Sequence, residues 1–221
     1  VIRYADDFIV LCKTLEDAED VYNLLEDYLD ERGLTLAPDK TKITHINDGF
    51  DFLGFNIRCY NGYDRDKVLI KASKDSIKSF KRKAKYIIRR CYPWNIEESI
   101  IKLNNLIIGT SNYWKMASNK RIFSKMDNYI YELLLRQIKR WYPNKPIKWM
   151  VKKHFKTHLH STYNDKWIFT DPITNCQVEK MYWTRIKYSR CIKYKATPYD
   201  SSYDEYFLKR YGKTSFEYLY G

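Results

Sequence analysis

The spacing of apolar residues changes near residue 70, and this change limits the fold more than any other feature of the sequence. Before it, short runs of β-branched and aromatic residues stand between polar turns, a pattern that predicts short strands. After it, apolar residues recur every three or four positions, which predicts amphipathic helices. The expected strands cover 1–4, 8–12, 34–37, 41–46, 50–57 and 68–71. The fold class is therefore α+β, with a small antiparallel sheet and one helix followed by a mostly helical region.

Capping residues place the expected helices. Thr14, with Asp17 three residues later, begins a helix that ends before Gly33, and Asn95 with Glu98 has the same capping pattern. Beyond Ser73 we expect helices over 73–91, 95–109 and 120–142, one opened by Pro146 and one near 203–211. The helix over 95–109 is expected to continue over 111–117 after a bend. Two short strands are expected around Asp171-Pro172. We place the boundary near residue 70, so that 1–70 and 71–221 form two domains.

Charge divides along the same line. Residues 1–66 carry 15 acidic and 7 basic residues, a net −8, and residues 67–221 carry 12 and 33, a net +21, which together give the formal +13 of the chain. A basic region of this size suits a polyanionic partner, because each neutralised phosphate releases condensed counterions. Aromatic residues interleaved with the basic ones favour nucleic acid, since rings stack on bases. These are Tyr86, Tyr92, Trp94, Trp114, Trp141 and Trp149. The alternative is a solvated basic surface over ordinary core aromatics.

The basic residues are densest between 78 and 90, where no acidic residue interrupts them. They are Lys78, Lys81, Arg82, Lys83, Lys85, Arg89 and Arg90. On a helix they predict phosphate contacts that do not depend on base sequence. The alternative is again a solvated face.

Composition excludes several classes of protein. An apolar content of 44% with 17% aromatics excludes a mostly disordered chain. The apolar stretches are far shorter than the roughly 20 residues that cross a bilayer, and the N-terminus has no signal-peptide pattern, so we expect an intracellular protein that does not enter a membrane. Five widely spaced cysteines without a C-x-x-C pair predict reduced thiols. They are Cys12, Cys59, Cys91, Cys176 and Cys191.

Two adjacent carboxylates, Asp6 and Asp7, occupy the predicted turn between the first two strands. Like charges this close repel, and divalent cations with a preference for oxygen ligands, such as Mg²⁺, remove that cost. Nucleotide polymerases use a strand–turn–strand with two aspartates to position a pair of metal ions for attack on a phosphate. The alternative is a solvated turn without metal.

Three motifs resemble those of reverse transcriptases. Tyr4-Ala5-Asp6-Asp7 is similar to the YxDD box, the segment 36–42 (LAPDKTK) to the next palm motif, and the segment 50–55 (FDFLGF) to the primer grip. The resemblance implies that Asp6 and Asp7 bind two Mg²⁺ ions in the complete enzyme. It also implies that Lys40 lies near the dNTP triphosphate and that Phe52, Leu53 and Gly54 form the primer grip. A glycine there also suits close approach of the backbone to a nucleic acid strand. For Lys40 the alternative is a helix- or strand-edge lysine without a catalytic task.

The second region resembles the thumb and maturase domain (domain X) of group II intron proteins, through Leu103 to Trp114 and the segment 167–169 (WIF). This implies RNA-templated DNA synthesis from a DNA primer, together with binding of intron RNA to assist splicing, in the bacterial cytoplasm or an organelle. Residues 1–70 would be the end of the palm and 71–221 the thumb and maturase region.

In this family a further aspartate and the fingers precede YxDD, whereas three residues precede Tyr4. We therefore expect that a fingers and palm segment is missing and that these 221 residues alone do not polymerise, which primer extension by the isolated chain would refute. Two alternatives stay open. One is an RNA-binding maturase-like module with a vestigial catalytic hairpin, and the other is a reverse transcriptase of a non-intron bacterial retroelement or defence system.

Three histidines form a weaker candidate site. The spacing of His154, His158 and His160 allows two metal ligands on one helical face, but no glutamate or cysteine stands beside them. Phosphate contact or plain surface is the favoured interpretation.

Overall fold

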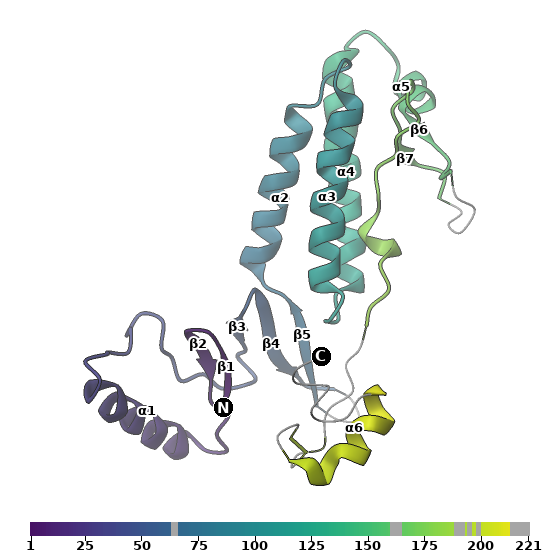
Figure 1. Ribbon diagram of the computed structural model, residues 1–221. Helices are drawn as coiled ribbons and strands as arrows, with labels where there is room; N and C mark the ends of the chain where they lie inside the picture. The colour runs from purple at the N-terminus through teal and green to yellow at the C-terminus, as the bar shows by residue number, and fades with distance from the viewer. Residues whose placement is uncertain (63–65, 160–164, 188–192, 194–195, 198–199, 213–221) are drawn as a thin grey trace. The chain divides into compact units, whose positions relative to one another are not determined.

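The computed structural model describes residues 1–62, 66–159, 165–187, 193, 196–197 and 200–212. The chain separates into two compact units, Val1–Ile186 and Lys187–Gly221. In the described part, the strands of every sheet pair antiparallel and helices supply the remaining regular structure (Figure 1). The predicted α+β class is confirmed.

The first two strands form the predicted hairpin. β1 (Ile2–Tyr4) pairs with β2 (Asp7–Ile9), and Tyr4 lies opposite Asp7. The helix α1 (Leu15–Asp30) follows. Its capping box is the predicted one, because Asp17 N donates to Thr14 Oγ1 at 3.1 Å and Thr14 N donates to Asp17 Oδ2 at 3.2 Å. No residue of α1 is buried within the described chain.

The strands predicted over 34–37 and 41–46 are wrong, because both segments are irregular. The backbone turns at Pro38 rather than extending, since Lys40 N and Thr41 N both donate to Ala37 O, at 3.0 and 2.9 Å. Ile46 O accepts one hydrogen bond from Cys59 N of β4 at 2.9 Å, but neither segment forms a ladder with a strand in the described residues. Apolar alternation alone does not hold a strand, because its backbone groups need a neighbouring strand as a partner.

The segment predicted as one strand over 50–57 is a tight hairpin. β3 (Phe50–Phe52) and β4 (Phe55–Tyr60) pair antiparallel, and β5 (Lys67–Ala72) pairs with the other edge of β4. Leu53 and Gly54 form the two-residue loop with φ of +48° and +76°. Two-residue hairpin loops with positive φ at both positions match the right-handed twist of the strands they join.

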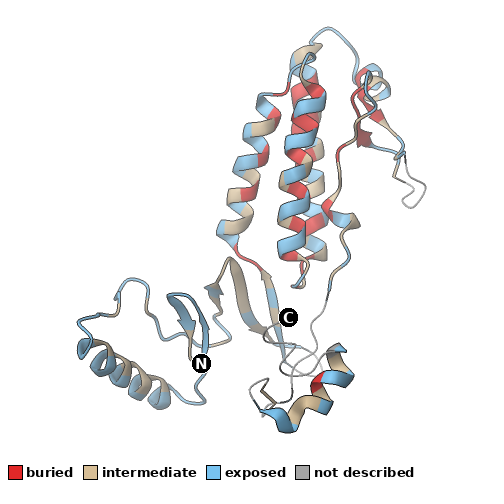
Figure 2. Cartoon of the chain, in the orientation of Figure 1, coloured by how far each residue is buried: buried red, intermediate tan, exposed pale blue. Residues whose placement is uncertain are grey.

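Three helices carry most of the buried core. α2 (Lys74–Arg89) packs against both α3 (Ile96–Trp114) and α4 (Lys120–Trp141), and the buried residues lie on the facing sides (Figure 2). Burying one such side chain contributes about 1.5–3 kcal/mol. The fully buried large residues of these helices are Ile100, Leu103, Ile107, Phe123 and Ile138.

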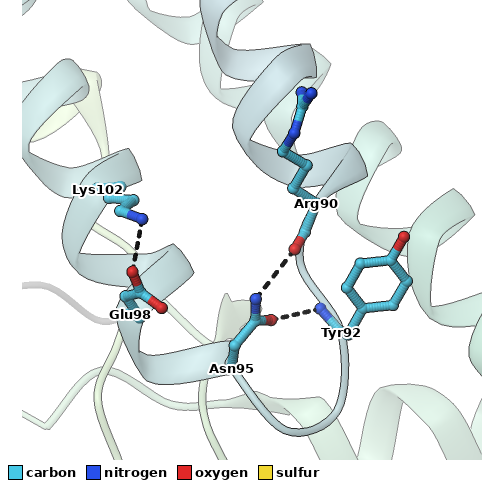
Figure 3. A network of polar contacts seen from close by, with 5 residues as sticks. All are labelled: Arg90, Tyr92, Asn95, Glu98 and Lys102. Atoms are coloured by element: carbon cyan, nitrogen blue, oxygen red, sulfur yellow. Dashed lines mark hydrogen bonds and ion pairs between the residues drawn. The ribbon is translucent and has the colours of Figure 1, made fainter.

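Helix α3 differs from the prediction in two ways. It continues through Gly109 without the expected bend, because Ile107 and Trp114 on either side lie in the core and hold the helix straight. Asn95 is at its N-cap position but does not cap it. Its side chain turns back to the α2–α3 loop, where Asn95 Oδ1 accepts from Tyr92 N at 2.7 Å (Figure 3). Glu98 pairs instead with a lysine one turn later in α3.

A smaller group of elements packs on α4. It comprises α5 (Ile147–His154), β6 (Phe155–Lys156), β7 (Ile168–Phe169) and the 3-10 helix η1 (Met181–Trp183). Of the two strands expected around Asp171-Pro172, β7 precedes Asp171, and in place of the second the described residues show an isolated bridge between Thr170 and Gln177. The Asp171 carboxylate instead caps a turn, accepting from Ile173 N at 3.0 Å.

In the second unit, η2 (Ser201–Tyr203) leads into α6 (Asp204–Tyr211), which confirms the helix predicted near 203–211. Phe207 is buried, and Gly212 ends the helix with a φ of +69°. None of the helices in the described ranges combines the length and apolarity required to span a bilayer.

Candidate nucleic-acid interface and carboxylate hairpin

The two aspartates stand exposed at the β1–β2 turn. Ala5 adopts a left-handed φ of +51°, and Arg3 Nε donates to Ala5 O at 2.9 Å, which holds the turn closed. In the described part of the chain, neither Asp6 nor Asp7 makes an ion pair or a side-chain hydrogen bond. Open, adjacent carboxylates are suitable oxygen ligands for a divalent cation.

The same hairpin supplies only part of a metal cage. Among the described residues, no group of three or more histidine, cysteine, aspartate or glutamate side chains comes close enough together to hold a metal ion. The carboxylate pair fits Mg²⁺ in its chemistry, and its assignment as a metal site stays a prediction.

Lys40 is exposed at the end of the turn that begins at Ala37. No hydrogen bond or ion pair in the described structure joins its side chain to Asp6 or Asp7. Its catalytic assignment stays a prediction.

The loop of the β3–β4 hairpin is clamped to two helices. Gly54 O accepts from Ser73 N at 2.9 Å and from Ser76 Oγ at 2.9 Å, both at the start of α2. Tyr113 of α3 donates from its hydroxyl to Leu53 O at 2.7 Å, and its ring lies 5.1 Å from that of Phe55. The predicted primer-grip residues Phe52, Leu53 and Gly54, which we call the FLG turn, are thus held at the N-terminal end of α2.

This clamp explains the glycine. A Cβ on Gly54 would lie 2.8 Å from Ser76 Oγ, and the φ of +76° disfavours any other residue. The close approach is to α2 of the same chain, whereas the expected close approach was to a nucleic acid strand. Sequence reasoning missed Ser73, Ser76 and Tyr113 as supports of the loop. Ser73, the N-cap of α2, was the available signal.

Four basic side chains form a continuous surface along α2, which we call the α2 stripe: Lys78, Arg82, Lys85 and Arg89. At about 100° per residue they fall within an arc of roughly 60°, away from the buried Phe80, Ala84 and Ile88. All four are exposed, and none forms an ion pair within the described residues.

The other predicted basic residues lie outside the stripe. Lys81 is half-buried, with Nζ 5.0 Å from the centre of the Tyr129 ring. Lys83 is exposed on the other flank of the buried face. The Arg90 guanidinium lies 3.6 Å from the centre of the Tyr86 ring.

The interleaved aromatics divide into two groups. Trp114 is buried in the core, and Trp141 is half-buried, donating from Nε1 to Cys91 O at 3.2 Å. The exposed members are Tyr86, Tyr92, Trp94 and Trp149. For Trp114 and Trp141 the alternative of ordinary core aromatics therefore holds, whereas the exposed group stays a candidate for nucleic-acid contact.

The histidine site is corrected by the structure. His154 is fully buried between Tyr142 and Phe169, with ring centroids 5.7 and 5.9 Å away, so it is neither a surface nor a phosphate contact. Its two ring nitrogens have no hydrogen-bond partner among the described residues. Burial lowers the pKa of His154 to about 4. The His158 ring lies 4.4 Å from that of Trp183, and His160 lies outside the described residues.

Burial raises the pKa of a cysteine and of an aspartate in this fold. The described cysteines are free thiols, and burial raises the pKa of Cys91 to about 11. Asp127 accepts from Met181 N and Tyr182 N at 2.8 and 2.9 Å, which ties η1 to α4. Burial raises the pKa of Asp127 to about 6, although these N–H groups oppose that shift.

Two protein-family models match this chain, one over its first strands and one over the helices that follow. Residues 1–57 match the family model for reverse transcriptase (RNA-dependent DNA polymerase). Residues 77–155, which contain the α2 stripe and helices α3 to α5, match the model for the group II intron, maturase-specific domain.

A curated relative covers part of the same sequence. The ribosomal operon-associated A protein of Euglena longa is 33% identical over 107 residues, which is 47% of this chain and 20% of that protein. The chain thus matches about a fifth of the length of this relative. A reverse-transcriptase match on the carboxylate hairpin and the FLG turn, followed in one chain by a maturase-specific match on the basic helices, places this chain in the group II intron reverse transcriptase/maturase family.

Proposed function

We propose that this chain serves in an RNA-directed DNA polymerase of group II intron type that also binds intron RNA to assist splicing, and that the α2 stripe holds the RNA backbone. The observation that carries the proposal is the direct connection between the clamped FLG turn and the unpaired basic side chains of α2. Only Ser73 separates β5 from this helix, and Gly54 O is bound at its first turn.

The electrostatics support RNA as the partner of α2. Positions four residues apart on a helix are separated by about 6 Å along its axis, so the stripe offers a row of cations to successive phosphates. Lysine and arginine side chains without intramolecular partners remain free for such contacts. Template RNA paired with a DNA primer and the parent intron RNA are the expected ligands.

Asp6 and Asp7 are the proposed metal ligands. Mg²⁺ held there would activate the primer 3′-hydroxyl and neutralise charge on the departing pyrophosphate. Lys40 is proposed to lie near the triphosphate of the incoming dNTP, and Phe52, Leu53 and Gly54 to position the primer end. Residues 1–70 are proposed to be palm, and residues 71–221 thumb and maturase region.

The salt dependence of RNA binding tests the role of α2. We expect the triple variant Lys78→Ala/Arg82→Ala/Arg89→Ala to lower the slope of log K against log salt by about 2 to 3 in magnitude, since each lost phosphate contact removes about 0.7–0.9. Fluorescence anisotropy with a labelled RNA at several salt concentrations measures the slope.

A matched variant removes the same formal charge elsewhere. Lys102, Arg136 and Lys209 are exposed and each is already paired with a glutamate one turn away. Replacing these three by alanine should leave the slope nearly unchanged. Equal slopes for the wild-type chain and the α2 triple variant would refute the assignment of α2 as the RNA contact. Equal reductions of the slope in the two triple variants would show a general effect of charge and would also refute this assignment.

One observation favours a second candidate, an RNA-binding module with a vestigial hairpin. In the described part of the chain the carboxylate pair has no third acidic, histidine or cysteine ligand and no hydrogen bond or ion pair with Lys40. Titration with Mn²⁺, followed by electron paramagnetic resonance, distinguishes the two. Binding that disappears in Asp6→Asn/Asp7→Asn supports the polymerase site, and equal binding by wild type and variant supports the RNA-binding module.

A further inference from the structure

The α2–α3 loop presents an exposed, stacked pair of aromatic rings. The rings of Tyr92 and Trp94 lie parallel, with centroids 4.9 Å apart and an interplanar angle of 2°. Trp94 is 80% exposed and Tyr92 41%. Since Tyr92 covers one face of the indole, this degree of exposure leaves the opposite face open to solvent. Contiguous exposed apolar surface is a feature of interaction sites, and here two stacked rings form it together.

The loop is held rigidly from both sides. Asn95 accepts from Tyr92 N at 2.7 Å and donates to Arg90 O at 3.1 Å, while the Tyr92 ring points away from this network (Figure 3). The intervening Pro93 fixes its own φ.

The other anchor of the loop is Cys91, which is buried. Its carbonyl accepts from Gln137 Nε2 at 2.9 Å and from Trp141 Nε1 at 3.2 Å, both in α4. A ring pair on a backbone fixed in this way loses little conformational entropy when a ligand binds.

Two arginines directly precede the loop in the sequence. Arg90, immediately before the loop, stacks on Tyr86 with its guanidinium 3.6 Å from the ring centre, and Arg89 ends the α2 stripe. The acidic Glu98 nearby is neutralised by Lys102 at 2.5 Å. An anionic partner with a flat apolar face is therefore favoured over an acidic peptide, which offers the charge without the ring.

We propose that Trp94, supported by Tyr92, is a stacking platform for an unpaired nucleobase of an RNA strand whose phosphates follow the α2 stripe. This inference rests on the proposed function, because it identifies the form of RNA bound at the C-terminal end of the stripe. Stacking on an aromatic ring tolerates any base, since each has a π face. A base within a duplex is already stacked on both sides, so the platform selects single-stranded or unpaired positions.

The test uses the full chain and two probes of the same sequence, a single-stranded RNA of about 20 nucleotides carrying 2-aminopurine and its fully paired duplex. We expect Trp94→Ala to weaken single-strand binding about tenfold. The salt slope should stay unchanged, because no charge is lost. Duplex binding should change little. Trp94→Phe should recover most of the affinity and Trp94→Leu should not, because leucine preserves apolar area without a π face.

The exposed Trp167, which is 54% exposed, provides the matched control, and Trp167→Ala should bind both probes as the wild type does. Unchanged single-strand affinity in Trp94→Ala, equal losses for single strand and duplex, or full recovery by leucine would each overturn the platform. If the α2 triple variant still lowers the salt slope in these cases, the proposed function survives alone. A wild-type chain that binds neither RNA would overturn both proposals.

Discussion

Replacing His154 by phenylalanine should remove a specific loss of stability in acid. Burial lowers the pKa of His154 to about 4, with Lys153 contributing in the same direction and Asp171 opposing it, against an ordinary value of 6.5. Below pH 6.5 His154 becomes protonated in the unfolded chain, whereas in the folded chain it stays neutral until about pH 4. Stability is therefore lost as the pH falls. The full difference corresponds to about 3 kcal/mol, of which about 2 kcal/mol falls between pH 7 and pH 5.

The comparison must be made between His154→Phe and wild type, because Asp127 acts in the opposite direction. Its pKa is raised to about 6, so its ionisation destabilises the fold as the pH rises through that value. The contribution of Asp127 to the pH dependence of stability is the same in both proteins, so it cancels when the two are compared. Phenylalanine keeps a ring between Tyr142 and Phe169 and removes the two unpartnered nitrogens.

Urea unfolding at pH 7 and pH 5, followed by circular dichroism, measures the effect. The wild type should lose about 2 kcal/mol more than the variant between the two pH values. If both proteins lose the same amount, or if NMR titration of His154 gives a pKa near 6.5, the argument from burial is wrong.

Two further substitutions test the contacts around α2, and urea unfolding measures both. Gly54→Ala should destabilise the fold by about 2–3 kcal/mol, from the left-handed φ and from the displacement of Ser76, and adding Ser76→Gly should recover the steric part only. Asn119→Ala should cost about 2–4 kcal/mol, because it leaves Ala72 N and Trp114 O buried without the partners that Asn119 now provides at 2.8 Å each. Losses below about 0.5 kcal/mol would contradict these two assignments.

The sequence predicted the local elements whose signals lie within a few residues. The Thr14 capping box, the hairpin at Asp6 and Asp7 and helix α4 depend on periodicity and on turn residues, and all three are confirmed. The seven basic residues between 78 and 90 were predicted as one group, whereas in the structure only four of them lie together as the α2 stripe.

Features set by distant contacts were not predictable in this way. The carboxamide of Asn95 has the right spacing for a cap but binds the loop instead, because Tyr92 N and Arg90 O compete for it. His154 reads as a surface residue in a run of lysines, and its burial depends on rings from α4 and β7. The hydrogen bond from Tyr113 to Leu53 O, which helps to hold the β3–β4 loop, joins residues 60 positions apart, and no local sequence pattern indicates it.

Ser73 alone separates the last strand of the sheet from the first residue of α2. The register of β5 therefore determines which side of α2 faces in a given direction. Insertion or deletion of one residue at this junction would turn the four cations of α2 by about 100° relative to the FLG turn. A junction this short tolerates substitution but not a change in length, because the direction in which the α2 stripe faces is set by the sheet.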